Sequence, residues 1–189
     1  MRYRAGSAER AGGIPAHVPV LETERLRLRG QTMADFPACE ALWGDPETVR
    51  FIGNGTPSGR EETWAKFLRN AGHWAMLGFG YWMVEEKATG AFIGLIGFSD
   101  LHREIEPPLP DAPEAGWVLS PKAHGKGYAT EAVRAALAWG ETRFGSPRSV
   151  CLIAPDNVPS LRVAEKCGYA EFARATYKER PVVLLARGT

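Results

Sequence analysis

The spacing of apolar residues near the start of the chain predicts a strand followed by a helix. The stretch "RLRLRG", residues 25–30, alternates strictly, so we expect Leu26 and Leu28 to face the core and the arginines to face solvent. Residues 32–46 follow with apolar side chains on one helical face, and Thr32 is suited to cap this helix. The apolar face consists of Phe36, Cys39, Leu42 and Trp43.

A second helix and a hairpin are predicted next. "SGREETWAKFLRNAGHWA" has Glu61 three places after Ser58, a capping-box pattern that predicts a helix ending near residue 71 or 72. "GYWMVEEKATGAFIGLIGF" predicts strands at 80–85 and 91–98, joined by a turn at 87–90. The second of these strands is apolar nearly throughout, which is typical of a central strand covered on both faces.

The second half of the chain alternates between predicted strands and helices. Residues 100–114 are rich in proline and acidic residues and predict a surface loop. The predicted elements after it are the strand "GWVLS", a helix at 130–140, a buried strand at 149–154, a short helix from Asn157 to Gly168, and a closing antiparallel pair. Strands that first stand alone and then alternate with helices predict a mixed α/β (α+β) sheet with helices on both faces.

Length and composition predict a single globular domain without a general affinity for polyanions. We expect residues 1–20 to form a disordered leader and residues 21–189 to form the domain. A net charge of +1 gives no broad field for nucleic acid or a membrane surface, and no apolar run is long enough to cross a bilayer. The cysteines lack CxxC spacing, so we expect packed, reduced thiols in a cytoplasmic protein and no metal site.

The stretch "PKAHGKGYATEA", residues 121–132, is the strongest candidate for chemistry. A dinucleotide-binding turn would need a third glycine and would follow its strand directly, and no P-loop pattern fits. A third interpretation is a pyrophosphate held by main-chain amides at a helix N-terminus, with Gly125 and Gly127 allowing close approach. Lys122 and Lys126 would add positive charge. A glycine turn with solvated lysines is the alternative that this stretch alone leaves open.

Three stretches in this order, "LETERLRLR", "GWVLSPKAHGKGYATEA" and "NVPSLRVAEKCGY", resemble the GNAT N-acetyltransferase superfamily and its RimJ/RimL-type branch. The resemblance runs from about Leu21 to the C-terminus. It implies a mostly antiparallel central sheet with a splayed parallel strand pair, and acetyl-CoA as co-substrate. Lys122 departs from the glutamine or arginine of the family loop; it keeps a cation but lacks the planar fork of arginine.

The resemblance also implies where acetyl-CoA binds. Its pyrophosphate would lie on the glycine loop, and its pantetheine arm would pair with the strand before that loop as an added strand would. Asn157 matches the family asparagine that contacts this arm, although capping the helix that follows is an equally good use of it. The implied coenzyme contacts are Trp117, Val118, Leu119, Lys122, His124, Gly125, Lys126, Gly127, Tyr128, Ala129, Asn157 and Ser160.

Two residues are candidates for catalysis, and no metal is implied. Glu114 matches an acidic residue of the branch and would act as base for the amine, or it is one more acid in an acidic loop. Many relatives place a tyrosine seven residues after the asparagine to protonate the departing sulfur, but Ala164 stands there in this chain. Ser160 would donate in its place, or be an ordinary first-turn helix residue.

The resulting hypothesis is a cytoplasmic N-acetyltransferase that moves the acetyl group directly to a primary amine. A catalytically inactive acyl-CoA-binding sensor or partner module is the alternative from another class. The acceptor is a peptide N-terminus or a small molecule, and a homodimer is left open. Helical spacing favours the core rather than the acceptor pocket for Trp43, Trp64 and Phe67. Some of the aromatics near Trp74, Tyr81 and Trp82 are candidates for that pocket.

Overall fold

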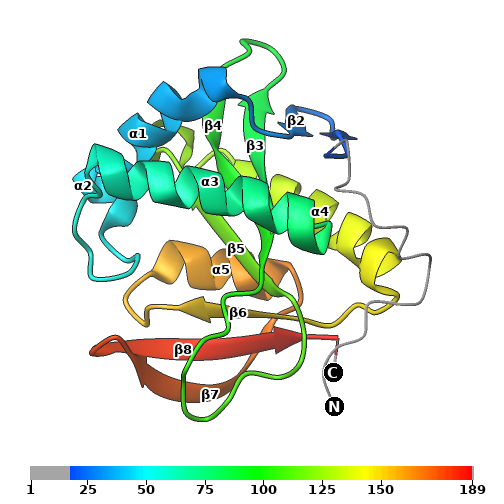
Figure 1. Ribbon diagram of the computed structural model, residues 1–189. Coiled ribbons are helices and arrows are strands. Elements are labelled where there is room, and N and C mark those ends of the chain that lie inside the picture. The colour runs from blue at the N-terminus through cyan, green and yellow to red at the C-terminus, as the bar shows by residue number, and fades with distance from the viewer. Residues whose placement is uncertain (1–17, 189) are drawn as a thin grey trace.

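One sheet, with helices on both of its faces, organises the chain (Figure 1). The computed structural model describes residues 18–188; the predicted leader lies outside this range except for residues 18–20, whose Pro19 carbonyl accepts a hydrogen bond from Trp82 Nε1 at 2.7 Å. The described residues give eight strands in the order β1-β2-β3-β4-β5-β6-β8-β7. These strands are β1 (Leu21–Glu22), β2 (Leu26–Arg29), β3 (Tyr81–Glu86), β4 (Phe92–Ser99), β5 (Glu114–Leu119), β6 (Ser149–Ile153), β7 (Ala170–Tyr177) and β8 (Arg180–Arg187).

Each face of the sheet carries its own apolar cluster. On one face, Phe36 of α1 and Phe67 of α3 pack against sheet residues such as Leu95. On the other face, Val133 of α4 belongs to a larger cluster with Trp82. In Figure 1, α3 crosses the front of the sheet and α4 lies behind it. The α-helices are α1 (Phe36–Gly44), α2 (Pro46–Val49), α3 (Arg60–Leu77), α4 (Tyr128–Phe144) and α5 (Val158–Lys166).

The sheet opens between its two parallel strands. β5 pairs with β4 in antiparallel register along its whole length, from Glu114 opposite Ser99 to Leu119 opposite Gly94. On its other edge β5 pairs with β6 only at Glu114, opposite Val150. Beyond that point the strands diverge, so the β6 side of the rest of β5 is left without a ladder partner. The predicted mixed fold with a splayed parallel pair is therefore confirmed.

The second helix differs from its prediction at both ends. Ser58 does not cap it; the N-cap is Gly59, and the Ser58 hydroxyl instead accepts a hydrogen bond from Lys66. At the other end α3 continues to Leu77, past the predicted end at residue 71 or 72. A helix interior tolerates one glycine at a cost of about 1 kcal/mol, and burial of Trp74 against Trp82, with ring centroids 4.8 Å apart, favours the longer helix.

Most other elements agree with the sequence pattern. The predicted hairpin is confirmed as β3 and β4, and the closing pair as β7 and β8. The helix after the glycines starts at Tyr128 and ends at Phe144, so it exceeds the predicted range of 130–140 at both ends. Gly168 follows the last turn of α5 at φ 84°, as expected of a C′ glycine. The short elements β1 and α2 were not predicted.

The described residues also test the expected surroundings of the cysteines. Cys39, Cys151 and Cys167 are all buried free thiols, which confirms that they are packed. Among residues 18–188, no group of three or more His, Cys, Asp or Glu side chains is arranged to hold a metal ion. No helix in the same range has the length and apolar character needed to traverse a membrane.

Candidate active site

The glycine loop has the main-chain geometry of an anion-binding turn. Gly125 lies at φ 74° and Gly127 at φ 78°, a left-handed conformation that costs a residue with a side chain about 1–2 kcal/mol. Gly127 is the N-cap of α4, and no side chain caps this helix. The first intrahelical bond runs from Glu131 N to Gly127 O at 3.1 Å, so the amides before Glu131 have no intrahelical partner. The glycines thus lie directly at a helix start, as the sequence predicted.

Arg25 supports this loop from β1–β2, a role that sequence analysis missed by assigning it to solvent. Its Nη1 donates to the Lys126 carbonyl at 2.9 Å, and its Nε donates to Glu131 at 2.7 Å. The guanidinium also lies 4.6 Å from the centroid of the Tyr128 ring. Burial disfavours the charge of Glu131, but hydrogen bonds from Thr23 and Arg25 outweigh it and lower the pKa of this carboxyl. Arg25, between β1 and β2, therefore supports the loop through a hydrogen bond to its main chain and an ion pair with the first turn of α4.

Of the remaining loop side chains, His124 supports the loop, whereas the two lysines are exposed. His124 Nε2 lies 3.2 Å from the Leu119 carbonyl, which ties the loop back to the end of β5. Lys122, on the 3₁₀ turn Pro121–Ala123, and Lys126 are both exposed beside the glycines. Both lysines can thus contribute positive charge to an anion at the helix start.

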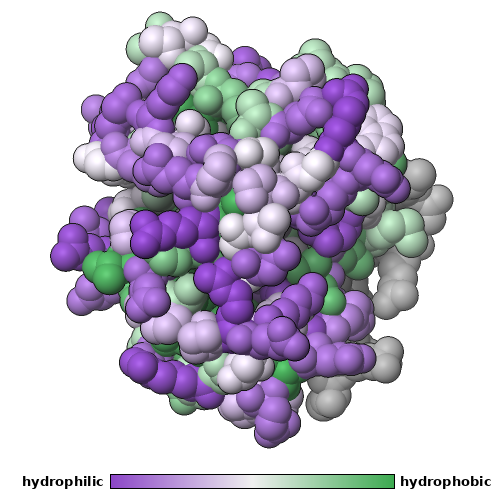
Figure 2. All heavy atoms as spheres, turned by 90° about the vertical axis from the view of Figure 1, so that its left-hand side faces the viewer, coloured by the Kyte–Doolittle hydropathy of each residue, from purple (hydrophilic) through white to green (hydrophobic). Residues whose placement is uncertain are grey.

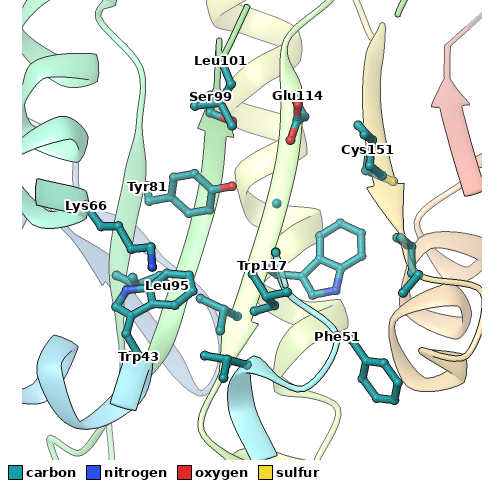
Figure 3. Close-up of a pocket in the computed structure, with 18 of the residues that line it drawn as sticks. Trp43, Phe51, Lys66, Tyr81, Leu95, Ser99, Leu101, Glu114, Trp117 and Cys151 are labelled. Carbon is teal, nitrogen blue, oxygen red and sulfur yellow. The ribbon is translucent and has the colours of Figure 1, made fainter. Parts of the chain in front are cut away.

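Across the gap in the sheet, Trp117 connects β5 to α5. Its Nε1 donates to Ser160 Oγ at 3.3 Å, and Figure 3 shows the indole projecting from β5 toward β6. Asn157 Oδ1 accepts a hydrogen bond from Ser160 N at 3.3 Å, so this side chain does cap α5. The cap uses only the carbonyl oxygen of Asn157, whose NH₂ group has no hydrogen-bond partner among residues 18–188.

A cavity of about 560 Å³ lies along β5 on the α1–α3 side. Its wall includes Gly116, Trp117 and Val118, together with Asn157 and Ser160 from α5. Several aromatic side chains complete it, among them Phe67 and Tyr177. Figure 3 shows three more of them, Trp43, Phe51 and Tyr81.

Aromatic side chains of the first half were partly misplaced by sequence analysis. Phe67 belongs to a core cluster as predicted and Trp43 packs against it, and both also border the cavity. Trp64 is 36% exposed, so its prediction as a core residue is wrong; its ring packs against Phe36, with ring centroids 5.0 Å apart, outside the cavity wall. Tyr81 lines the cavity as expected, whereas Trp82 is fully buried in the cluster on the α4 face.

Glu114 is buried in this cavity and held by an arginine. It is the first residue of β5 and only 8% exposed, so it is not a solvated acid of the preceding loop. Arg103 donates from Nε at 2.5 Å and from Nη2 at 2.6 Å to its two carboxylate oxygens. Burial opposes the charge of Arg103, yet the hydrogen bond to Glu114 prevails and raises the pKa of the guanidinium. No sequence signal pointed to Arg103, because it lies in a loop without periodicity.

Tyr81 meets β5 next to Glu114. A Cβ placed on Gly116 would lie 2.0 Å from the Tyr81 hydroxyl oxygen, so only glycine at 116 lets the phenol approach the strand. Burial raises the pKa of Tyr81 to about 12, and the negative charge of Glu114 acts in the same direction. Figure 3 shows the hydroxyl directed at β5. The site therefore holds a neutral O–H donor beside a buried carboxylate.

Comparison with known proteins gives a consistent result. A family model described as acetyltransferase (GNAT) domain matches residues 25–170. The uncharacterized N-acetyltransferase YoaA of Bacillus subtilis (strain 168) is 28% identical over 154 residues, which cover 80% of this chain and 82% of YoaA. A solved acetyltransferase from Agrobacterium tumefaciens str. C58 has a TM-score of 0.76 at 32% identity, covering 91% of this chain and 95% of that one.

More distant structures share the fold alone. The ribosomal-protein-S5-alanine acetyltransferase from Vibrio fischeri has a TM-score of 0.70 over 90% of this chain and 96% of that one, but only 18% sequence identity.

Proposed function

Because this chain belongs to the acetyltransferase (GNAT) family, we propose that it transfers an acetyl group from acetyl-CoA directly to a primary amine. Family membership makes it an acetyl-CoA-dependent acyltransferase. We further propose that the transfer is direct, that the acceptor is a primary amine, and that single residues have the roles given below. A cytoplasmic location and membership of the RimJ/RimL-type branch are also part of the proposal. The observation that carries it is Glu114, buried on the strand that borders the opened sheet, with the Tyr81 hydroxyl reaching the same strand from β3 at Gly116.

The coenzyme would use two main-chain features of the fold. The free amides at the start of α4, with Gly125 and Gly127, suit a pyrophosphate, and Lys122 and Lys126 add charge. The unpaired edge of β5 suits the amide groups of the pantetheine arm, from Trp117 to Leu119. The NH₂ of Asn157 is available for the same arm.

The transfer itself needs a base, an oxyanion donor and an acid. The amine nitrogen attacks the thioester carbonyl carbon, the C–N bond forms as the C–S bond breaks, and the amine loses one proton. Arg103 uses one lone pair on each oxygen of Glu114, so each oxygen keeps another with which to accept that proton. Main-chain N–H groups of β5 would meet the oxyanion. Ser160 would donate a hydrogen bond to the departing sulfur, which leaves as a thiolate and regains through solvent the proton that the amine gave to Glu114.

An acetylation assay tests the proposal. The full chain is incubated with acetyl-CoA and a panel of amines, and free thiol and acetylated product are followed by absorbance and mass spectrometry. We expect thiol release that depends on the acceptor.

The outcome that contradicts the proposal is calorimetric binding of coenzyme A without transfer to any amine. That result would favour the sensor or partner module instead. Ala164, at the position where many relatives have a tyrosine, and the occupied carboxylate of Glu114 are the features that keep this second candidate open.

A further inference from the structure

Cationic side chains outnumber carboxylates on the wall of the cavity. The charged residues that line it are Glu62, Lys66, Arg69, Arg103, Glu114, Lys178 and Arg180. Both carboxylates are already bound within the protein: Lys66 lies 2.6 Å from Glu62, and Arg103 lies 2.5 Å from Glu114. The other three cations have no carboxylate partner among residues 18–188.

Each of these three cations carries an uncompensated charge. Arg180 donates to the carbonyls of Gly53 at 3.1 Å and Arg50 at 3.4 Å, which are neutral acceptors. Lys178 contacts the ring of Tyr177, with its ammonium 5.7 Å from the centroid.

Arg69 has neither a hydrogen bond nor an ion pair with any described residue. Burial raises the pKa of Tyr81, and the charge of Arg69 acts in the opposite direction, so this guanidinium lies within electrostatic range of the phenol.

The three cations are separate from the place proposed for the coenzyme phosphates. No residue of the loop 121–132 lines this cavity. Arg69 comes from α3, whereas Lys178 and Arg180 come from the β7–β8 turn and the start of β8. All three share the cavity wall with Glu114 and Tyr81, the residues proposed to act on the acceptor, and that wall includes none of the loop proposed for the pyrophosphate. Figure 2, which views the molecule from the side of α2 and the β7–β8 turn, shows a mainly hydrophilic face there.

We infer that the amine acceptor also carries a carboxylate, as a free amino acid does; this inference rests on the proposed function. Uncompensated cations repel a polyamine, and no carboxylate on the wall is free to pair with one. The arginine fork matches a carboxylate through two parallel hydrogen bonds. Trp43, Phe51 and Tyr177 supply apolar wall for a side chain. An amino acid with an apolar side chain therefore suits the cavity best.

Acceptors that differ in charge test this inference, and phenylalanine and its amide form a pair of nearly equal shape. With saturating acetyl-CoA, kcat/KM is measured for phenylalanine, phenylalanine amide, phosphoethanolamine and spermidine. The amine of the amide loses its proton more readily than that of the acid, so intrinsic reactivity favours the amide. We expect the acid to be preferred by about tenfold or more, the effect of one well-formed charged hydrogen bond. Such a preference must come from the protein.

Arginine variants locate the source of the preference. Arg69→Gln should reduce the acid-to-amide ratio about tenfold with the KM for acetyl-CoA unchanged, and Arg180→Gln should reduce it similarly. Arg148→Gln, an exposed arginine outside the cavity wall, is the matched control and should keep the wild-type ratio.

The failures of the two proposals are distinguishable. Absence of thiol release with every amine would overturn the proposed function. Transfer to the amide or to spermidine as efficient as transfer to the acid would overturn only this inference, and so would an unchanged ratio in both Arg69→Gln and Arg180→Gln. A preference for phosphoethanolamine over phenylalanine would overturn the inferred carboxylate and indicate an acceptor that carries a phosphate.

Discussion

The two sides of β5 differ in the kind of group that would contact a ligand. On the coenzyme side, the groups that would contact a ligand belong mostly to the main chain: two glycines at positive φ, the free amides of α4 and the unpaired strand edge. On the acceptor side they are side chains from separate segments, namely Arg69, Tyr81, Arg103 and Arg180. The first side should thus be sensitive to glycine replacement, and the second to replacement of polar side chains. Four substitutions test this contrast.

The largest effect is expected on the acceptor side. Glu114→Gln removes the proposed base, so turnover should fall about 100-fold or more, most at low pH where the amine is more protonated. The Kd for coenzyme A, measured by calorimetry, should stay near that of the wild type.

The control for Glu114→Gln tests whether any loss of activity comes from leaving its partner Arg103 unpaired. A buried arginine left unpaired can cost about 3–5 kcal/mol of stability, so thermal unfolding is measured in parallel. The double variant Arg103→Gln/Glu114→Gln has no unpaired charge. If the double variant recovered activity, Glu114 would serve only as the partner of Arg103, and its role as base would be wrong.

On the coenzyme side, the main prediction concerns Gly127→Ala. At φ 78° an alanine is strained by about 1–2 kcal/mol, so relaxation of the loop should weaken coenzyme A binding about tenfold. The acid-to-amide ratio of acceptors should not change. Gly145→Ala is a matched control, because Gly145 has φ 65° at the far end of α4 and open space around its Cα. Equal loss of affinity in both variants would contradict a local role for the loop.

Tyr81→Phe should have a smaller effect, confined to the acceptor. Loss of one neutral hydrogen bond predicts a drop of about threefold to tenfold in kcat/KM for the amine. Because the pKa of Tyr81 is raised to about 12, its hydroxyl stays protonated in wild type, so this loss should be constant up to about pH 10. Tyr169→Phe, a buried tyrosine outside the cavity wall, is the control and should leave the kinetics unchanged. A loss that vanished below pH 10 would contradict this account.

The same tyrosine should be visible in stability measurements. A pKa that is raised in the folded state means that Tyr81 stabilises the protein fully below about pH 10 and loses this contribution as the pH rises towards 12. The unfolding free energy of wild type should therefore fall relative to Tyr81→Phe over that alkaline range, as measured by urea unfolding.

The smallest effect is expected for Arg25→Gln. Arg25 is an exception on the coenzyme side of β5, because there a side chain supports the main-chain groups that would contact the ligand. Loss of its bond to the Lys126 carbonyl should weaken coenzyme A binding about threefold without changing kcat. Arg27→Gln, which replaces an exposed arginine of β2 two residues further on, should leave binding unchanged. Equal effects of the two substitutions would indicate that only net charge matters.

This contrast also explains what the sequence could predict. Gly125 and Gly127 could be predicted as loop residues because a positive φ favours glycine, which is visible in the sequence itself. The splayed strand pair was predicted from the family resemblance. The helix end at residue 71 or 72 was wrong because the packing of Trp74 on Trp82, which outweighs the glycine, is a tertiary contact.

Acceptor-side residues could not be found in this way. Arg180 meets the carbonyl of Gly53 across 127 positions of the chain. No spacing rule connects residues so far apart, since only the tertiary fold brings them together. Glu114 was predicted from the resemblance, but its partner Arg103 depends on the path of an irregular loop.

The indole of Trp117 gives the protein an internal optical probe. Its N–H donates to Ser160 across the space between β5 and α5. Trp74, Trp82 and Trp139 pack together in the core, with ring centroids 4.8–5.7 Å apart, and should emit as a constant background. Entry of a thioester arm beside β5 should therefore change the emission of Trp117, and Trp43→Phe would remove the other tryptophan on the cavity wall from the signal. Occupancy of the gap could then be followed in real time without any attached dye.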